Sequence, residues 1–259
     1  MRVSSPQLSQ PLTVVFLTAL LVFSTVKINS AQPPGSGNSS HVSTSNITFD
    51  RANKKSILGD VTLGHATGTQ MKSPQDIDRT MIRLREALLK YTRIDAKVDR
   101  QIRLSSREIM KLPFVYIAFE GGFDLTKAES DNLNAYLKSG GFIMIDKFDI
   151  SREDNPAESA FGPMINKALG SRVRVHRLQN SHQIFSSYFD FPEGPPLNVN
   201  TGSRVMDSTS EVNYLEGITM NGRLVGICSS KYSWGEMQLQ FGINAIVFAL
   251  TQKGGIAQK

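Results

Sequence analysis

One continuous segment, from Leu112 to Asp149, reads LPFVYIAFEGGFDLTKAESDNLNAYLKSGGFIMIDKFD and contains a complete strand–helix–strand unit. Phe114 to Phe119 is an uninterrupted apolar run, which is typical of a strand buried on both faces of a parallel sheet. The run ends at Gly121-Gly122, and Phe142 to Ile145 forms a second run of the same kind. Because a crossover through a helix joins parallel strands, the segment predicts a parallel sheet covered by helices.

The helix between these two strands carries signals at both of its ends. Thr126 is predicted to cap its start, and Glu129, three residues later, completes a capping box. Gly140-Gly141 follows the last helical turn, where a left-handed residue commonly ends a helix. An apolar stripe for packing on the sheet is formed by Leu133, Tyr136 and Leu137.

Length and composition bound the class of protein. The chain has 259 residues, of which 40% are apolar and 20% charged, as is ordinary for a globular domain with appendages. The only cysteine is Cys228, so an internal disulfide and a cysteine-cluster metal site are both excluded. Cys228 ends the apolar run LVGIC, which favours a buried structural thiol over a nucleophile.

Much of the net charge of +6 lies between Lys72 and Lys111, where eleven basic residues face six acidic ones. The simpler interpretation is a solvated helix face followed by a charged connector. The alternative is contact with an acidic surface such as anionic lipid. Tyr91 is the one aromatic residue among these charges, which argues against a stacking platform for nucleic acid.

The first 31 residues resemble an export signal or an N-terminal membrane anchor. Leu12 to Val26 is an uncharged, mostly apolar run, shorter than the roughly 20 residues that a spanning helix needs. We therefore expect an exported protein, located in the periplasm or otherwise outside the cytoplasm, with a membrane tether through residues 12–26 if the signal is not cleaved. Residues 32–45 are rich in Pro, Gly and Ser and are predicted to be a disordered linker.

Residues 46–252 are predicted to form one α/β domain, and residues 253–259 to be a frayed tail. A helix is expected to start at Ser73-Pro74, and a β-hairpin around Asn221-Gly222. Asn53 to Thr69 is polar and dotted with glycines, so it is predicted to be a loop with room for a short strand. His65 lies in it without a second ligand at motif spacing. Further predicted elements are strands at Ile47–Phe49, Ile94–Val98 and Arg172–Leu178, and a buried helix at Phe241–Leu250.

Several segments together resemble the bacterial domain-of-unknown-function family numbered 4159: PFVYIAFEGGFDLTKAE, NLNAYLKSGGFIMID, SHQIF, LEGITMNGRLVGIC and FGINAIVFAL. The resemblance implies a three-layer α/β/α sandwich with a mostly parallel sheet, flavodoxin-like and similar to class I glutamine amidotransferases, plus the C-terminal β-hairpin. It names no reaction or cofactor, and the cofactor stays unknown. It implies export or membrane attachment and, as in some members, company with MoxR-type ATPases and von Willebrand-type modules. The chain departs from the family at Lys147, where a second acid is usual, and at Gln183, where proline is usual.

The chemistry of glutamine hydrolysis is excluded, because the strand-to-helix turn that would carry a cysteine nucleophile carries Asp146. A ligand cleft is instead expected at the carboxyl ends of the parallel strands. Asp146 and Glu120, with His182 from a later loop, suit an acid/base pair or a divalent metal. The alternative gives these three residues structural roles in turns and hydrogen bonds. The remaining residues of the predicted cleft are Gly121, Gly122 and Asp149.

Three functions remain open from the sequence. The leading hypothesis is a non-catalytic binding or assembly domain with an envelope protein as partner. Its candidate surfaces are the Pro-rich run from Ser186 to Asn213 and the loop with Tyr232 and Trp234. The alternative is an envelope hydrolase or a carbohydrate-acting enzyme that uses Asp146, Glu120 and His182. The third is a lipid contact through residues 72–111.

Overall fold

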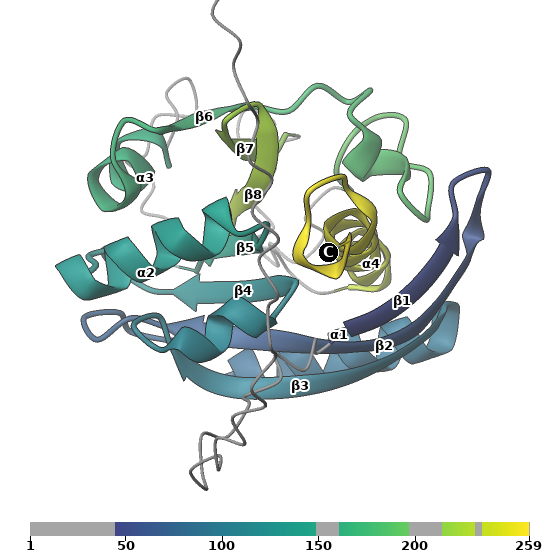
Figure 1. The fold of residues 1–259 in the computed structure, drawn as a ribbon, viewed down its shortest axis with the longest axis horizontal. Coiled ribbons are helices and arrows are strands. Elements are labelled where there is room, and N and C mark those ends of the chain that lie inside the picture. The colour runs from purple at the N-terminus through teal and green to yellow at the C-terminus, as the bar shows by residue number, and fades with distance from the viewer. Residues whose placement is uncertain (1–44, 149–160, 197–213, 231–234, 259) are drawn as a thin grey trace, which may run out of the picture. The chain divides into compact units, whose positions relative to one another are not determined.

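The computed structural model describes residues 45–148, 161–196, 214–230 and 235–258 (Figure 1). The predicted export segment, nearly all of the predicted linker, and Asp149 lie outside these residues. So do residues 197–213 of the Pro-rich run, and Tyr232 and Trp234. None of the helices within the described ranges combines the length and the apolar character needed to cross a bilayer.

Eight strands of the described chain form one sheet. They are β1 (Ser45–Asp50), β2 (Asn53–Thr67), β3 (Arg93–Arg103), β4 (Phe114–Phe119), β5 (Phe142–Lys147), β6 (Val173–Arg177), β7 (Glu216–Met220) and β8 (Arg223–Ser230). The strands β3, β2, β4, β5 and β8 run parallel in that order, followed by the antiparallel β7 and the edge strand β6. The prediction of a mostly parallel sheet is confirmed.

The long strand β2 organises one side of the sheet. Its residues Leu58 to Val61 pair with β1 and with β3 at the same time, so β1 and β3 lie on opposite edges of β2. Further along, Leu63 and Gly64 pair with β3 on one edge and with β4 on the other. The chain therefore moves from β2 outward to β3, and then returns across β2 to form β4.

Helices cover both faces of the sheet. The residues of β4 alternate: Phe114, Tyr116 and Ala118 pack with α1 (Ile77–Tyr91) and α4 (Glu236–Thr251). The alternate residues Val115, Ile117 and Phe119 pack with α2 (Lys127–Lys138) and α3 (Gly162–Leu169). A strand buried on both faces must be apolar throughout, which explains the uninterrupted run recognised in the sequence.

The predicted capping box of α2 is confirmed, since the Thr126 side chain accepts from the Glu129 amide and Glu129 reaches back to the Thr126 amide. The predicted start of α1 at Ser73-Pro74 is wrong: this helix begins at Ile77, after Asp76. The Ser73 hydroxyl does not cap it but donates to Thr67 Oγ1, 3.2 Å away.

The prediction of a loop over Asn53–Thr69 is also wrong, because most of this segment is β2. Its polar character reflects partial exposure of the first half, where exposed and half-buried residues alternate. Gly59 adopts φ +136°, and a Cβ there would lie 1.8 Å from the carbonyl oxygen of Asn46. This glycine therefore marks the close approach of β1 to β2 and not a break in the strand.

The strands around Asn221-Gly222, β7 and β8, pair antiparallel within the main sheet, and β8 is an interior strand beside β5. The last residues also differ from expectation. The Ile256 amide donates to the Gly140 carbonyl, 3.1 Å away, and Gln258 Nε2 donates to the Leu250 carbonyl, 2.7 Å away. Short 3-10 helices complete the structure at Arg107–Lys111, Gln183–Ser186 and Ile256–Gln258.

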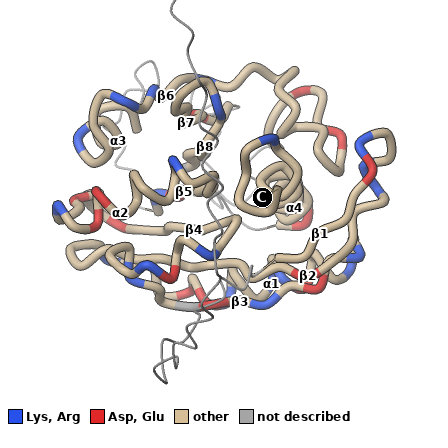
Figure 2. The backbone as a smooth tube through the Cα atoms, viewed as in Figure 1, with Lys and Arg blue, Asp and Glu red and all other residues tan. Residues whose placement is uncertain are grey.

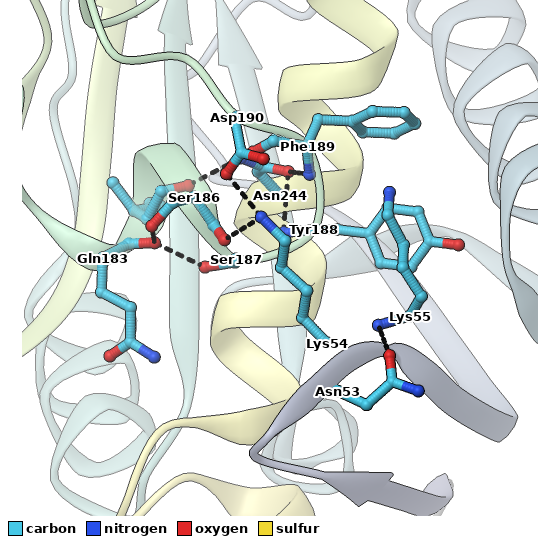
Figure 3. A network of polar contacts seen from close by, with 11 residues as sticks. Asn53, Lys54, Lys55, Gln183, Ser186, Ser187, Tyr188, Phe189, Asp190 and Asn244 are labelled. Atoms are coloured by element: carbon cyan, nitrogen blue, oxygen red, sulfur yellow. Dashed lines mark hydrogen bonds and ion pairs between the residues drawn. The ribbon is translucent and has the colours of Figure 1, made fainter.

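The first half of β2 and the preceding β1 form an arm that lies beside α4 and the loop after Gln183–Ser186 (Figure 1). Figure 3 shows the contacts of this arm: Lys54 Nζ lies 2.5 Å from Asp190 Oδ1 and donates to the Ser186 carbonyl at 3.3 Å. Lys55 Nζ lies 3.6 Å from the centre of the Tyr188 ring. The arm and the loop are thus held together by an ion pair, a hydrogen bond and a cation–π contact.

Candidate functional site

The predicted site residues Glu120 and Asp146 lie at the carboxyl ends of the neighbouring strands β4 and β5. Their side chains have different partners. Glu120 forms an ion pair with Lys72, whereas the fully buried Asp146 accepts from Tyr116 Oη at 2.9 Å. Both carboxylates thus make structural contacts, although they share one edge of the sheet.

His182 makes its contacts elsewhere in the domain. Its Nδ1 accepts from the Ile184 amide at 3.2 Å, and its ring centre lies 5.5 Å from that of Phe248. The Phe248 ring in turn contacts Phe142, which begins β5. Burial, with a smaller contribution from His176, lowers the pKa of His182. These contacts connect His182 to the start of β5, whereas Asp146 lies near the end of that strand.

The other residues of the predicted cleft add no ligand set. Gly121 adopts φ +78°, a conformation that favours glycine in the turn after β4. Asp149 lies outside the described residues. Within the described part of the chain, no three His, Cys, Asp or Glu side chains are grouped so as to hold a metal ion.

A pocket with a volume of about 360 Å³ lies at the carboxyl ends of β2 and β3, beside the start of α1. Its lining comes from both strands, from the loop before α1 and from the first turn of that helix. In open α/β sheets, ligands bind outside the carboxyl ends of the strands where the chain reverses its direction across the sheet. In this sheet the chain reverses its direction at β2, which lies between β3 and β4. The lining residues are His65, Thr67, Ser73, Pro74, Gln75, Ile77, Asp78, Gln101 and Arg103.

A β-bulge turns the end of β3 toward this pocket. Gly64 pairs with Asp99 and Ala66 with Ile102, so β3 carries one extra residue opposite β2. Gln101, in this extra stretch, has φ +56°. Before the bulge Ala96 packs on the α1 side of the sheet, and after it Ile102 packs on the α2 side. Gln101 and Arg103 consequently face α1 and line the pocket, a known use of bulges next to binding sites.

His65 is the buried polar group of the pocket. Its side chain is 1% exposed, and neither ring nitrogen has a hydrogen-bond partner among the described residues. Burial lowers the pKa of His65, and the negative charge of Asp78 opposes this effect only in part. The imidazole is therefore neutral near pH 7, so one ring nitrogen is an N–H donor and the other is a hydrogen-bond acceptor. A buried polar group without a partner costs about 1–3 kcal/mol, which a ligand that bonds to it recovers.

Two opposite charges line the pocket. Asp78 lies in the first turn of α1, where the helix dipole favours a negative charge. Its Oδ1 is buried without a hydrogen-bond partner in the described chain. Arg103 ends β3, lines the same pocket and is exposed. The two side chains are not within ion-pair distance of each other, so each is available to a ligand.

His65 belongs to a row of three buried polar side chains that crosses the sheet from β2 through β4 to β5. His65 of β2 pairs in register with Tyr116 of β4, and Tyr116 donates to Asp146 of β5. All three side chains are buried. Asp146, predicted as a site residue, thus belongs to the same row as His65, but only His65 lines the pocket.

The loop that follows β2 is held by Glu129. Its Oε1 accepts from the amide and the hydroxyl of Thr69, at 2.7 and 2.8 Å. Its Oε2 accepts from the amide and the hydroxyl of Thr126, both at 2.9 Å. One buried carboxylate therefore ties this loop to the start of α2.

Sequence reasoning missed this site. The sequence pattern predicts a loop around His65, because glycines and polar residues obscure the strand there. The available signal was the alternation of Ile57, Val61 and Leu63, all buried on one face, which continues to His65. A histidine at the end of a strand that leads into a helix points to the ligand-binding edge.

Three lysines of the basic region 72–111 form ion pairs within the fold. Lys72 pairs with Glu120, Lys90 with Glu236, and Lys111 with Glu108. Figure 2 shows acidic positions interspersed with the basic ones along α1 and β3. A second hollow, lined by residues 177–180, contains no titratable side chain other than Arg177.

The fold and the pocket define a mixed α/β domain with a polar site at the carboxyl ends of its parallel strands. The chain belongs to the family described as "Domain of unknown function (DUF4159)", whose model matches residues 64–240. The matched region contains every residue that lines the pocket. No curated protein matches the chain.

Proposed function

We propose that this protein is an exported, non-catalytic binding domain that holds a small polar ligand in the His65 pocket. The observation that carries the proposal is the buried imidazole that lines the pocket without a hydrogen-bond partner in the described chain. Binding pockets combine a few convergent polar groups with perturbed pKa values in a space of this size.

The finer fold assignment supports the location of the ligand. The parallel strands β3, β2, β4, β5 and β8 follow the order 2-1-3-4-5 of flavodoxin-like sheets. In such sheets the switch point lies between the first and third strands, which correspond to β2 and β4. The pocket is lined by β2 and β3, so β2 is the strand that it shares with the switch point. We propose that the domain is of this flavodoxin-like and amidotransferase-like type and uses the carboxyl end of β2 for binding.

A non-catalytic role is supported by the burial of the only cysteine in the sequence, Cys228. Cys228 lies within β8 and is 1% exposed. Burial, with a smaller contribution from Glu216, raises the pKa of its thiol well above the ordinary value. Only the thiolate is a good nucleophile, so this cysteine is unsuited to attack a substrate.

The proposal includes export and an envelope protein partner, which follow from the N-terminal segment and the family resemblance. Mass spectrometry of protein purified from the cell envelope tests the first part. We expect a chain that begins near residue 32, or an intact chain in the membrane fraction. A chain with an intact N-terminus in the soluble cytoplasm contradicts it.

The binding function is tested by thermal shift of the full chain with a panel of amino acids, dipeptides, sugars and phosphates. We expect at least one compound to raise the unfolding temperature of the parent protein. His65→Leu should abolish that shift, because it removes both ring nitrogens. The matched control is His176→Leu on β6, outside the pocket.

Asp146→Asn separates this proposal from a site at the ends of β4 and β5. If His65→Leu leaves the shift intact and Asp146→Asn removes it, the ligand binds at the ends of β4 and β5 and not in the His65 pocket. The absence of any shift across the panel contradicts a small-ligand function at this site.

A further inference from the structure

We infer that the ligand is a zwitterion of amino-acid or dipeptide size, with its carboxylate at Arg103 and its amine at Asp78. This inference rests on the proposed binding function and specifies its ligand. The observation behind it is a pair of opposite charges that line one pocket without forming an ion pair with each other.

The charges select this class over the other polar ligands. Asp78, with a buried and unpartnered Oδ1, opposes a phosphate or another simple anion. Arg103 opposes a simple cation in the same way. Since a guanidinium binds a carboxylate in a two-pronged arrangement, Arg103 suits the acid end of a zwitterion. Asp78 suits the ammonium end.

The volume of the pocket and the polar side chains that line it fit a short peptide. An extended dipeptide separates its two ends by about 7 Å, and a pocket of about 360 Å³ accommodates it. A peptide bond offers one N–H donor and one carbonyl acceptor. The neutral His65 imidazole offers the complementary acceptor and donor. The hydroxyls of Thr67 and Ser73 line the same pocket and are suited to further hydrogen bonds.

Isothermal titration of the full chain with L-alanyl-L-alanine tests the inference, together with its N-acetyl and its C-terminal amide derivatives. The N-acetyl derivative lacks the positive charge, and the amide lacks the negative charge. We expect each derivative to bind about tenfold or more weakly than the dipeptide, as is typical when a hydrogen bond to a charged group is lost. If the dipeptide does not bind, single amino acids and their corresponding derivatives are titrated in the same way.

Two variants assign each end of the ligand. Asp78→Asn should weaken the dipeptide but have little further effect on the N-acetyl derivative. Arg103→Gln should weaken the dipeptide but have little further effect on the amide. Matched controls are Asp95→Asn and Arg107→Gln, which make the same changes at exposed positions outside the pocket.

The outcomes separate this inference from the proposed function. A sugar or phosphate that binds through His65, with no response to Asp78→Asn, overturns the zwitterion and leaves the binding function. Equal binding of the dipeptide and both derivatives overturns it too. If no amino acid, dipeptide, sugar or phosphate binds, both are overturned.

Discussion

At the scale of single residues, Glu129 shows how a buried charge is tolerated. Burial by itself raises the pKa of Glu129, but hydrogen bonds from Thr126 and Thr69 outweigh it, so the pKa lies below its ordinary value of 4.5. The folded state therefore favours the ionised form. The associated stability is fully present above the unfolded-state pKa and is lost as the pH falls through the folded-state pKa.

Glu129→Gln is expected to destabilise the domain by about 1–3 kcal/mol near neutral pH, because its amide nitrogen must face donors from Thr69 or Thr126. The difference from the parent should shrink as the pH falls below 4.5. Urea unfolding at a series of pH values measures it. Glu108→Gln, which removes a surface ion pair with Lys111, is the control and should cost less than about 1 kcal/mol. A pH-independent difference at Glu129 would contradict the role of its charge.

At the scale of elements, the helix α4 is apolar on nearly every side and buries two side-chain amides, those of Gln238 and Asn244. Asn244 Oδ1 accepts from the Tyr188 and Phe189 amides, at 3.2 and 2.7 Å. Its Nδ2 donates to the Ile184 and Phe189 carbonyls, at 3.0 and 2.8 Å. The loop that meets the β1–β2 arm is thus attached to the helix by one side chain (Figure 3).

Asn244→Leu keeps the size of the side chain but leaves these four backbone groups without their partner. We expect the free energy of unfolding to fall by at least about 3 kcal/mol, as measured by urea unfolding. Gln240→Leu makes the same kind of change on a partly exposed position of α4 and is the control. An equal effect of both substitutions would mean that the hydrogen bonds of Asn244 contribute little.

At the scale of the whole molecule, two apolar cores share one sheet. Residues of β4, β5 and β8 contribute to the core under α1 and α4 and to the core under α2 and α3. Disruption of the central strands exposes both cores, so the domain should unfold cooperatively. Cys228 lies in β8, one of these central strands, so the reactivity of its thiol measures whether the sheet is intact.

Cys228 is expected to react with a thiol reagent only when the domain unfolds, because its side chain is 1% exposed and its thiol pKa is raised. The midpoint of its reactivity in urea should coincide with the loss of helical circular dichroism. A chain with Cys228→Ser and Ser105→Cys, where the new thiol is exposed, is the control and should react at once. Rapid reaction of Cys228 in the folded protein would contradict this arrangement.

The sequence alone predicts those features that depend on residues close together in the chain. The apolar run Phe114–Phe119, the capping box of Thr126 and Glu129, and the burial of Phe241–Leu250 and Cys228 follow from periodicity, caps and composition, and the structure confirms them. Each depends on residues that are near one another in the chain.

The candidate site depended on pairing between distant segments. His65 becomes the floor of a pocket only because β2 lies between β3 and β4. Arg103 faces the pocket only because the bulge in β3 reverses the alternation of its side chains. Neither the strand order nor the bulge leaves a periodic signal in the sequence, since both arise from hydrogen bonds between segments far apart in the chain.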